Sequence, residues 1–596
     1  MMPLIRMICT TINNKLIKMK YSEILRTNNE LKRTLEGTSL FQVANLSNII
    51  TAQLNEIFEY TLRSHGINAH VSSGDYNNIV QDSVNCKDFD CIIIFWELCN
   101  IVDGLQYQIK LMGDSEVSAL AAKVKSEMNF VFKNLIKSPL VLFNKFSSLA
   151  FSYNNLTLSK FEELCLELNN YLTQNAPKNF VLVNIDKIIS QVSIEESIDY
   201  RSYNSSKALY TVLFYKKYSQ YINPIILSIK AKTKKVLIFD CDNTLWKGIL
   251  EEDGFDNIKM SGRDKEGVVF EEVQSIAKSL SKKGIIIGIC SKNNSNDVDY
   301  VFNKHPDMTL KSQDIVIKKV NWEDKYKNLV NIAKELNIGL DSLVFVDDSD
   351  FEIDMVSQQL PEVTTLQVPK RLYKYPQVIR DNLNLFFNHS VSGEDTDRVK
   401  MYKQEQQREK HISKFKDIKD YLKSLDLEID VHRDDKKLIT RIAQLTQKTN
   451  QFNLTTNRYT ETEIERFIKD KNYLVLALKV SDKFGSYGVT ALSVIKLDKC
   501  KSIAKIDTFL MSCRIIGRKV ELKFADYLIK EVHNMGIREI YGKYLKTLKN
   551  TQVADFFDKV GFKLFEHNGN KKTYKLDLAW YKGCDVDFIK ISDHKK

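Results

Sequence analysis

Two aspartates separated by one residue, Asp240 and Asp242, follow a short apolar run at 236–239. So apolar a run predicts a strand buried on both faces, and the period of two along a strand predicts that both carboxylates point to one side. Carboxylates that close repel unless a divalent cation or a shared proton separates them. The pattern fits a Mg²⁺ site with open positions for substrate oxygens, beside which Thr244 can hydrogen-bond a phosphate oxygen. Taken alone, an aspartate-rich strand end is more typical of a turn or a helix cap.

Polar side chains also follow the later apolar runs of this segment. They are Ser291, Lys292 and Asn293 after the run at 284–290, Lys325 after the polar stretch at 321–324, and Asp347 and Asp348 after the run at 343–346. The runs predict a doubly wound parallel sheet, whose ligand lies at the carboxyl ends of the strands. Lys325 has a second interpretation, as an ordinary surface lysine.

These motifs, in this order, resemble those of the haloacid dehalogenase-like (HAD) phosphohydrolases. The resemblance implies that Asp240 is the nucleophile, that Asp242 is the general acid/base, and that Lys325 balances the charge of the aspartyl phosphate. It also implies phosphate or substrate contacts from Thr244, Ser291, Lys292 and Asn293, and Mg²⁺ ligands among Asp240, Asp242, Asp347 and Asp348. The Lys325 ammonium and the Mg²⁺ ion are needed because an anionic carboxylate cannot otherwise attack an anionic phosphate.

A finer resemblance rests on the runs at 240–248, 321–325, 449–455 and 512–518, together with Asp347-Asp348. These segments look like the FkbH-like family, which couples an HAD domain to a GNAT-like domain. The resemblance implies a glyceryl transferase with phosphatase chemistry. Such an enzyme dephosphorylates 1,3-bisphosphoglycerate and loads a glyceryl group onto the phosphopantetheine thiol of an acyl carrier protein, for polyketide or related secondary-metabolite or glycan biosynthesis.

A basic segment lies where a predicted strand passes into a helix near residue 517. Backbone amides at the helix start and the guanidinium groups of Arg514 and Arg518 could hold a pyrophosphate or a pantetheine phosphate. GNAT enzymes carry a glycine-containing loop at this place; Gly517 matches it and Lys519 departs from it. The alternative is an arginine-rich helix start on a solvated face.

Acyl transfer through a protein thioester needs a reactive thiol, and two cysteines are candidates. Cys513 has Arg514 beside it and a helix start nearby, which favour the thiolate, although a buried core cysteine is an equal alternative. Cys241 lies between two aspartates that would raise its pKa, so buried packing is its more natural role. Direct transfer from an acyl phosphate to the carrier thiol would need neither.

The N-terminal part resembles an SGNH-hydrolase-like fold, with Ser47 after the first predicted strand. That family also needs a late Asp-x-x-His, and the segment Asp199-Tyr200-Arg201-Ser202 has no histidine. His65 and His70 both lie early. We therefore expect a degenerate, non-catalytic hydrolase domain in which Ser47 caps a helix.

The helices and strands that position these candidate residues are predicted to form three α/β domains. Alternating strand-like and helix-like runs place a helical segment at 1–36, an SGNH-like domain at 37–228, an HAD-like domain at 229–390, a charged helical connector at 391–424 and a GNAT-like domain at 425–596. Fewer than forty residues separate Trp246 from Ile285, too few for a separate cap domain. The predicted active site is therefore open.

The composition limits the classes of partner that the chain is expected to bind. A net charge of +11 over 596 residues is too dilute for the basic stripe that nucleic acid requires, but it suits phosphorylated metabolites and an acidic carrier protein. The sequence contains no run long enough to span a membrane, and the ten cysteines form no CxxC pair. We expect a cytoplasmic enzyme without nucleic-acid or membrane partners.

Two other functions stay open at this point. One is a plain Mg²⁺-dependent HAD phosphatase that acts on a small phosphorylated metabolite or a protein without acyl transfer. The other is a scaffold with inactive domains that binds a carrier protein. The scaffold predicts that Asp240→Asn leaves function intact.

Overall fold

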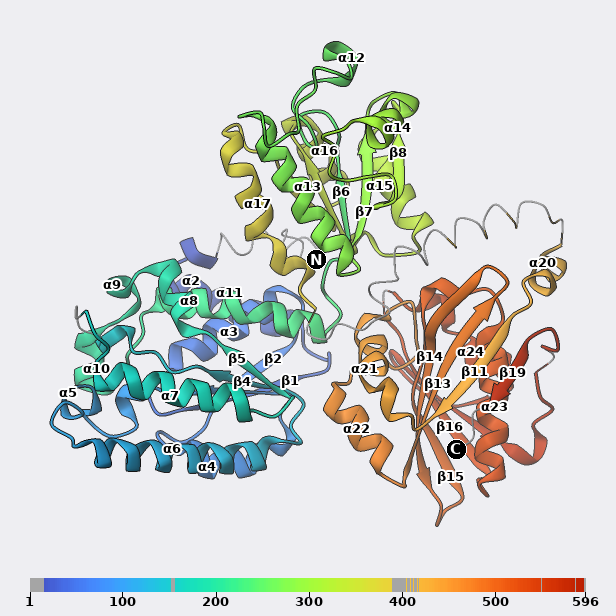
Figure 1. Ribbon diagram of the computed structural model, residues 1–596. Coiled ribbons are helices and arrows are strands. Elements are labelled where there is room, and N and C mark those ends of the chain that lie inside the picture. Colours follow the sequence, from blue (N-terminus) through green and yellow to red (C-terminus); the bar gives the residue numbers. More distant parts are fainter. Residues whose placement is uncertain are drawn as a thin grey trace. The chain divides into compact units, whose positions relative to one another are not determined.

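The computed structural model describes residues 16–151, 156–388, 404, 408, 411, 415, 417–547, 549–584 and 586–593 (Figure 1). The chain divides into two compact units, Met1–Ile226 and Leu227–Lys596. None of the helices in the described part of the chain combines the length and the apolar character needed to cross a bilayer.

Unit 1 is built on a five-stranded parallel sheet with the order β2-β1-β3-β4-β5. The strands are β1 (Phe41–Ser47), β2 (Ala69–Ser73), β3 (Cys91–Phe95), β4 (Val141–Asn144) and β5 (Phe180–Val183). The longer helices are α2 (Tyr21–Thr34), α3 (Ala52–Ser64), α6 (Asp114–Leu135), α7 (Lys160–Asn175), α8 (Ile185–Val192) and α11 (Val212–Ile229). Figure 1 shows helices on both sides of this sheet, so both of its faces are covered.

Unit 2 contains a second five-stranded parallel sheet, with the order β10-β9-β6-β7-β8, which we call the parallel sheet of unit 2. Its strands are β6 (Val236–Phe239), β7 (Ile286–Ser291), β8 (Ile315–Val320), β9 (Leu343–Asp347) and β10 (Thr364–Gln367). Its helices are α12 (Leu250–Asp253), α13 (Gly267–Lys282), α14 (Ser295–Lys304), α15 (Lys325–Glu335), α16 (Asp350–Gln359) and α17 (Tyr375–Asp381).

Alternation along β6 explains why this strand is apolar throughout. Leu237 and Phe239 belong to the core cluster that includes Phe270 of α13. Val236 and Ile238 point to the opposite face and belong to the cluster that includes Leu329 of α15. Because helices cover both faces, polar chemistry can lie only where the strands end.

The rest of unit 2 forms a nine-stranded sheet, the mixed sheet of unit 2, with the order β17-β18-β16-β15-β14-β13-β11-β19 and β12 paired to β15. Its strands are β11 (Glu428–Arg433), β12 (Phe452–Asn453), β13 (Tyr473–Asp482), β14 (Gly485–Asp498), β15 (Ile503–Met511), β16 (Glu539–Leu545), β17 (Lys563–Asn568), β18 (Lys571–Asp577) and β19 (Lys590–Asp593). Its helices are α20 (Ile418–Ser424), α21 (Ile439–Lys448), α22 (Glu461–Lys469), α23 (Val520–Asn534) and α24 (Phe556–Val560).

Two neighbouring strands of the mixed sheet diverge. β15 and β16 are parallel and pair only where residues 503–506 meet 539–542. Beyond this point β12 lies against β15, with Phe452 opposite Met511. Leu454 directly follows β12, and its carbonyl accepts from the amide of Leu545 in β16 at 2.8 Å. The segment 452–454 therefore lies between the two strands and forms hydrogen bonds with their backbone groups.

The predicted fold class is confirmed, because the described residues form three sheets with helices packed against them in α/β arrangements. The domain boundaries set from the sequence stay predictions. Most of the predicted connector at 391–424 lies outside the described residues. Its residue Arg408 is buried and donates to the carboxylate of Asp482 at 2.8 and 2.9 Å.

Candidate active site

The catalytic candidate Asp240 lies directly after β6, where the backbone leaves the strand. Its amide still donates to the carbonyl of Val346 in β9 at 2.9 Å, which fixes the residue at the carboxyl edge of the sheet. The chain then turns through Asn243, whose φ of 51° lies in the left-handed region that asparagine tolerates. Asp240 is buried, with 5% of its surface exposed.

Lys325 joins two of the predicted carboxylates. It is the first residue of α15, and its Nζ lies 3.1 Å from Asp240 Oδ1 and 2.6 Å from Asp347 Oδ2. Asp347 is the last residue of β9 and is fully buried; its other oxygen accepts from the amide of Ser349 at 2.9 Å. Asp240, Lys325 and Asp347 thus meet at one edge of the sheet, and the alternative of a surface lysine does not match the structure.

Burial and charge act in opposite directions on these groups. Burial raises the pKa of Asp347, the neighbouring Asp240 raises it further, and Lys325 opposes both effects. For Lys325, burial alone would lower the pKa, but the ion pairs with Asp240 and Asp347 outweigh it, so its pKa is raised. The lysine is therefore an ammonium at neutral pH.

Three carboxylates could hold a metal ion. Asp240, Asp347 and Asp348 each place an oxygen within 4.8 Å of the others. Burial, and then the charge of Asp240, raise the pKa of Asp348, which marks the excess negative charge that a cation would neutralise. Carboxylate oxygens are the ligands that Mg²⁺ prefers, and it keeps several positions for water and substrate oxygens. The residues present fit Mg²⁺.

The side chain of Asp242 has three hydrogen-bond partners of its own, while burial and then the charges of Asp240 and Asp348 raise its pKa. Its Oδ1 accepts from Trp246 Nε1 at 2.9 Å and from the amide of Leu250 at 3.1 Å, and its Oδ2 accepts from Asn293 Nδ2 at 2.9 Å. Its direction relative to Asp240 stays a prediction, because the period of two applies inside a strand and β6 has already ended. Asp242 is also placed outside the acidic cluster predicted to bind metal.

The environment of Asp242 still suits proton transfer. Burial raises its pKa to about 6, the two N–H donors of Leu250 and Trp246 hold it down, and the charge of Asp240 raises it further. A carboxyl group with a pKa near the working pH can both give and take a proton.

Two hydroxyl groups predicted to bind phosphate follow β6 or end β7, the two neighbouring strands at this edge of the sheet. Thr244 follows the turn after β6 and is fully buried, and its Oγ1 has no hydrogen-bond partner among the described residues. The phenol of Tyr375 donates to its carbonyl at 3.1 Å and holds the segment in place. Ser291 ends β7 and is also buried. A buried hydroxyl without a partner is costly, which fits a ligand oxygen at Thr244.

The neighbours of Ser291 have protein partners of their own. Lys292 Nζ forms an ion pair with Glu352 of α16 at 2.7 Å. Asn293 is buried and holds Asp242, so it positions the acid/base candidate in this structure. The tether of Asp242 by Trp246 and the role of Tyr375 were not predicted. Trp246 is four residues from Asp242 and could have been found, whereas Tyr375 is distant in sequence and carries no signal.

The two cysteine candidates differ in what the structure describes. Cys241 is fully buried, and burial followed by the charge of Asp240 raises the pKa of its thiol well above the ordinary value. A buried neutral thiol is a poor nucleophile, so the structure favours the packing role. Cys513 begins a short 3₁₀ helix (Cys513–Ile515), and its side chain lies outside the described part of the chain.

The two predicted phosphate-binding arginines of the mixed sheet have different surroundings. Arg514 Nε donates to Ser512 Oγ at 3.2 Å, and the residue lines a cavity. Arg518 is buried, lies 5.3 Å from the ring centroid of Tyr487 and donates to the carbonyl of Arg514. Gly517 between them has a φ of 87°, which glycine adopts without strain. The structure brings Arg514 to the cavity but not Arg518.

In unit 1 the predicted helix cap is wrong. Ser47 is the last residue of β1, and its Oγ donates to the carbonyl of Ile49 at 2.8 Å. The N-cap of α3 is Thr51. The cap shifts because four residues separate the strand from the helix. The early histidines pair locally, His65 with the carbonyl of Thr61 at 2.8 Å and His70 with Glu59 at 3.1 Å.

Solved structures resemble parts of the chain. The N-terminal part of a Bacteroides fragilis protein, which contains a phosphatase domain and was solved complexed with Mg, is 27% identical and has a TM-score of 0.54; the alignment covers 62% of this chain and 100% of that one. A GNAT-family acetyltransferase from Desulfovibrio desulfuricans is 10% identical over 25% of this chain and 99% of its own (TM-score 0.21). The ribosomal-protein-S18-alanine N-acetyltransferase from Escherichia coli is 9% identical over 25% and 94% (TM-score 0.20).

No protein-family model and no curated protein matches the chain. The similarity to the Mg-complexed protein agrees with the acidic cluster at the edge of the parallel sheet. Together they support an enzyme with phosphatase chemistry that uses Mg²⁺.

Proposed function

We propose that the chain is a Mg²⁺-dependent phosphohydrolase in which Asp240 is the nucleophile. The observation that carries this proposal is the contact of one buried ammonium, Lys325, with both Asp240 and Asp347. A third carboxylate, Asp348, completes a cluster whose negative charge calls for a cation.

The proposed reaction forms and breaks one bond at phosphorus. An oxygen of Asp240 attacks the phosphorus of a phosphate monoester, the P–O bond to the alcohol breaks, and the leaving alkoxide takes a proton from Asp242. Water then attacks the aspartyl phosphate, gives its proton to Asp242, and releases inorganic phosphate. Lys325 holds the charge of Asp240 and the phosphoryl group, and the Thr244 hydroxyl orients a phosphate oxygen. Mg²⁺, held by Asp240, Asp347 and Asp348, would neutralise charge on the carboxylates and phosphate oxygens.

Within this chemistry we propose a finer role, loading of a glyceryl group from 1,3-bisphosphoglycerate onto the phosphopantetheine thiol of an acyl carrier protein. The two phosphates of this donor must leave by different bonds. A thiol attacks the acyl carbon, so the C–O bond breaks and the acyl phosphate leaves as inorganic phosphate. The phosphate ester on the other carbon is removed at the P–O bond, which is the reaction available to Asp240. Hydrolysis of the acyl phosphate at phosphorus would destroy the activated group.

Intact-protein mass spectrometry of the carrier tests the finer role. The full chain is incubated with 1,3-bisphosphoglycerate, Mg²⁺ and a phosphopantetheinylated carrier. A mass gain of one glyceryl unit supports the proposal. With Asp240→Asn we expect the carrier to gain a phosphoglyceryl unit instead, because the phosphate ester stays intact. Asp297→Asn, an exposed carboxylate of α14, is the matched control and should behave as the unchanged chain.

A plain phosphatase is the second candidate, and one observation favours it. The thiol nearest in sequence to the nucleophile, Cys241, is buried and neutral, so the described site offers no reactive thiol for an acyl intermediate. This candidate predicts phosphate release from a phosphate monoester and an unchanged carrier mass. Loading that persists in a Cys241→Ser, Cys513→Ser double variant would instead indicate direct transfer to the carrier thiol.

A further inference from the structure

The segment 368–374, which joins β10 to α17, begins and ends at the candidate active site. β10 is parallel to β9 and ends level with Asp347, at the carboxyl edge of the parallel sheet. The amide of Val368 donates to the carbonyl of Asp347 at 2.9 Å. Directly after the segment, the phenol of Tyr375 donates to the carbonyl of Thr244 at 3.1 Å. The segment is therefore tied at both ends to residues of the site.

The segment carries three cations on its surface. Lys370, Arg371 and Lys374 are exposed, and their side chains form no hydrogen bond or ion pair with any residue in the described part of the chain. One carboxylate, that of Asp350, lies beside the start of the segment, where it accepts a hydrogen bond from Gln367. The cations outnumber this acid by three to one. Each of them lies within three positions of a tied end, which keeps its backbone within about 11 Å of that end.

Two exposed aromatic rings lie on the same edge of the sheet. Tyr373 belongs to the segment and is 68% exposed, and Phe351, in the first turn of α16 directly after β9, is 63% exposed. Tyrosine, phenylalanine and arginine are enriched at protein–protein interfaces, where rings of this kind serve as anchors. We call this surface the basic rim; its residues are Phe351, Lys370, Arg371, Tyr373 and Lys374.

The groups that would act on phosphorus are buried, in contrast to the rim. Asp240 is 5% exposed, and Thr244 and Asp347 are not exposed at all. Over the wholly described stretch 240–285, the chain forms only the helices α12 and α13, so no separate domain covers the site. A phosphate group must therefore enter the site while the rim stays outside. A small metabolite held by the buried groups would leave most of the rim uncovered, whereas a macromolecule can contact both.

We propose that the basic rim binds the acidic surface of a protein whose phosphate ester reaches Asp240 on a flexible arm. The proposal rests on the proposed phosphohydrolase and names the class of its substrate, a protein-bound ester rather than a free metabolite. Opposite charges on the two surfaces steer the encounter and hold the complex. The rim should therefore lower the KM for such a substrate and leave the chemical step unchanged.

Steady-state kinetics with two substrates test the proposal. One substrate is an acidic acyl carrier protein whose phosphopantetheine arm bears a 3-phosphoglyceryl thioester, and the other is 4-nitrophenyl phosphate. Each exposed ion pair contributes up to about fivefold in affinity. The rim variant Lys370→Gln, Arg371→Gln, Lys374→Gln should therefore raise the KM for the loaded carrier at least tenfold with an unchanged kcat. Hydrolysis of 4-nitrophenyl phosphate should not change. Added salt should raise the carrier KM of the parent chain more than that of the rim variant.

The matched control removes three exposed lysines from the ends of α13 and α15, which lead to the opposite edge of the same sheet. It is Lys282→Gln, Lys283→Gln, Lys334→Gln, and it changes the net charge by the same amount. The control should behave as the parent chain. An equal rise in carrier KM for the control and the rim variant would mean that only net charge matters, and it would overturn the proposal. So would a parallel loss of 4-nitrophenyl phosphate hydrolysis in the rim variant, because the segment would then support the buried site instead of binding a partner.

A binding measurement separates this proposal from the phosphohydrolase. Fluorescence anisotropy of the labelled carrier is recorded with the full chain carrying Asp240→Asn, so that no turnover contributes. Binding that weakens at least tenfold in the rim variant and not in the control supports the rim, even if the native chain releases no phosphate; that result would refute the phosphohydrolase alone. Equal carrier binding by the parent chain and the rim variant, together with active hydrolysis of 4-nitrophenyl phosphate, would refute the rim and leave the phosphohydrolase standing.

Discussion

Replacing Lys325 with methionine gives the sharpest test of the active-site geometry. The side chain of Lys325 is 6% exposed and neutralises Asp240 at 3.1 Å and Asp347 at 2.6 Å. Methionine fills similar space but leaves two buried carboxylates facing each other. Removing one partner of a buried ion pair costs about 3–5 kcal/mol. For a domain of 150–250 residues this corresponds to a fall in Tm of roughly 6–20 °C.

Differential scanning calorimetry of the full chain in EDTA measures the effect, because bound metal would mask it. The transition that contains the parallel sheet of unit 2 should fall, and less at pH 5 than at pH 8, since one carboxylate takes up a proton at low pH. Adding Asp347→Asn to Lys325→Met removes the repulsion and should restore most of the Tm. Phosphate release should stay abolished in both variants. Stability and catalysis are thereby separated.

Lys327→Met is the matched control, because Lys327 lies on the same helix and its side chain is 57% exposed. Its Tm should change by less than about 2 °C, as for most surface substitutions. The reasoning is refuted if Lys325→Met shifts the Tm no more than this control, or if the double variant is less stable than the single one.

Three further predictions concern other buried groups. Burial raises the pKa of Glu97 in unit 1 from 4.5 to about 8, although the hydrogen bond from Tyr210 opposes this shift. Between these pH values the folded state keeps a proton that the unfolded state loses. The free energy of unfolding should therefore fall between pH 4.5 and 8 by an amount on the order of 5 kcal/mol. Glu97→Gln should remove this dependence in calorimetric pH scans, and an unchanged slope would contradict it. Thr244→Val should weaken the inhibition of the phosphatase by inorganic phosphate about tenfold. It should leave the Tm unchanged or slightly higher, because the buried hydroxyl has no hydrogen-bond partner among the described residues. A lower Tm would mean that the hydroxyl is hydrogen-bonded within the fold. Cys241→Ser should retain carrier loading in the mass assay, since the thiol is buried and neutral; loss of loading with an unchanged Tm would assign it a catalytic role.

Some of the site follows directly from the order of residues along the chain. Each apolar run of 229–390 is followed by polar side chains, and parallel strands place their carboxyl ends at one edge of a sheet. This rule is enough to predict that Asp240 and Asp347 meet, whereas Lys325 was placed with them by the resemblance to the HAD phosphohydrolases. The fold class is predictable for the same reason, because runs buried on both faces and separated by amphipathic helices allow little besides a parallel sheet.

Other features depend on where the chain leaves its regular elements. The position of the Asp242 carboxylate is one example, because β6 ends at Phe239 and beyond that point three donors distant from the strand pattern hold this side chain. Ser47 was assigned to a helix that begins further along the chain. Strand periodicity is a local property, and it says nothing about a turn.

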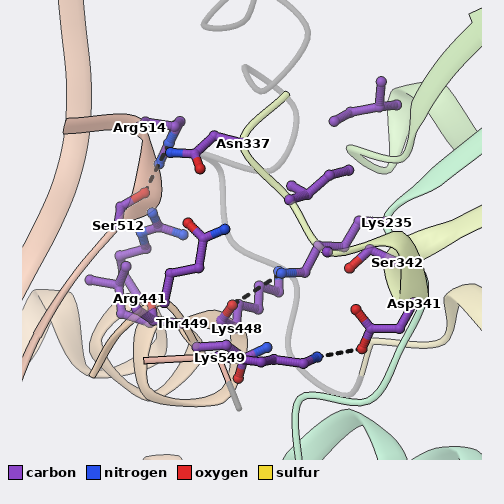
Figure 2. A pocket seen from close by; sticks show the side chains of 16 residues that line it. Lys235, Asn337, Asp341, Ser342, Arg441, Lys448, Thr449, Ser512, Arg514 and Lys549 are labelled. Carbon is purple, nitrogen blue, oxygen red and sulfur yellow. Dashed lines mark hydrogen bonds and ion pairs between the residues drawn. The ribbon is translucent and has the colours of Figure 1, made fainter. Parts of the chain in front are cut away.

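One cavity of unit 2, shown in Figure 2, brings together residues that only the tertiary structure places side by side. Lys235, Arg441, Lys448, Arg514 and Lys549 are spread over more than three hundred positions and form no motif. Electrostatic potential depends on distance in space, and only the packing of α21 beside the beginnings of β6 and β9 brings these charges together. The amino-acid sequence determines which strand ends carry carboxylates; the folded chain alone determines which distant charges share one cavity.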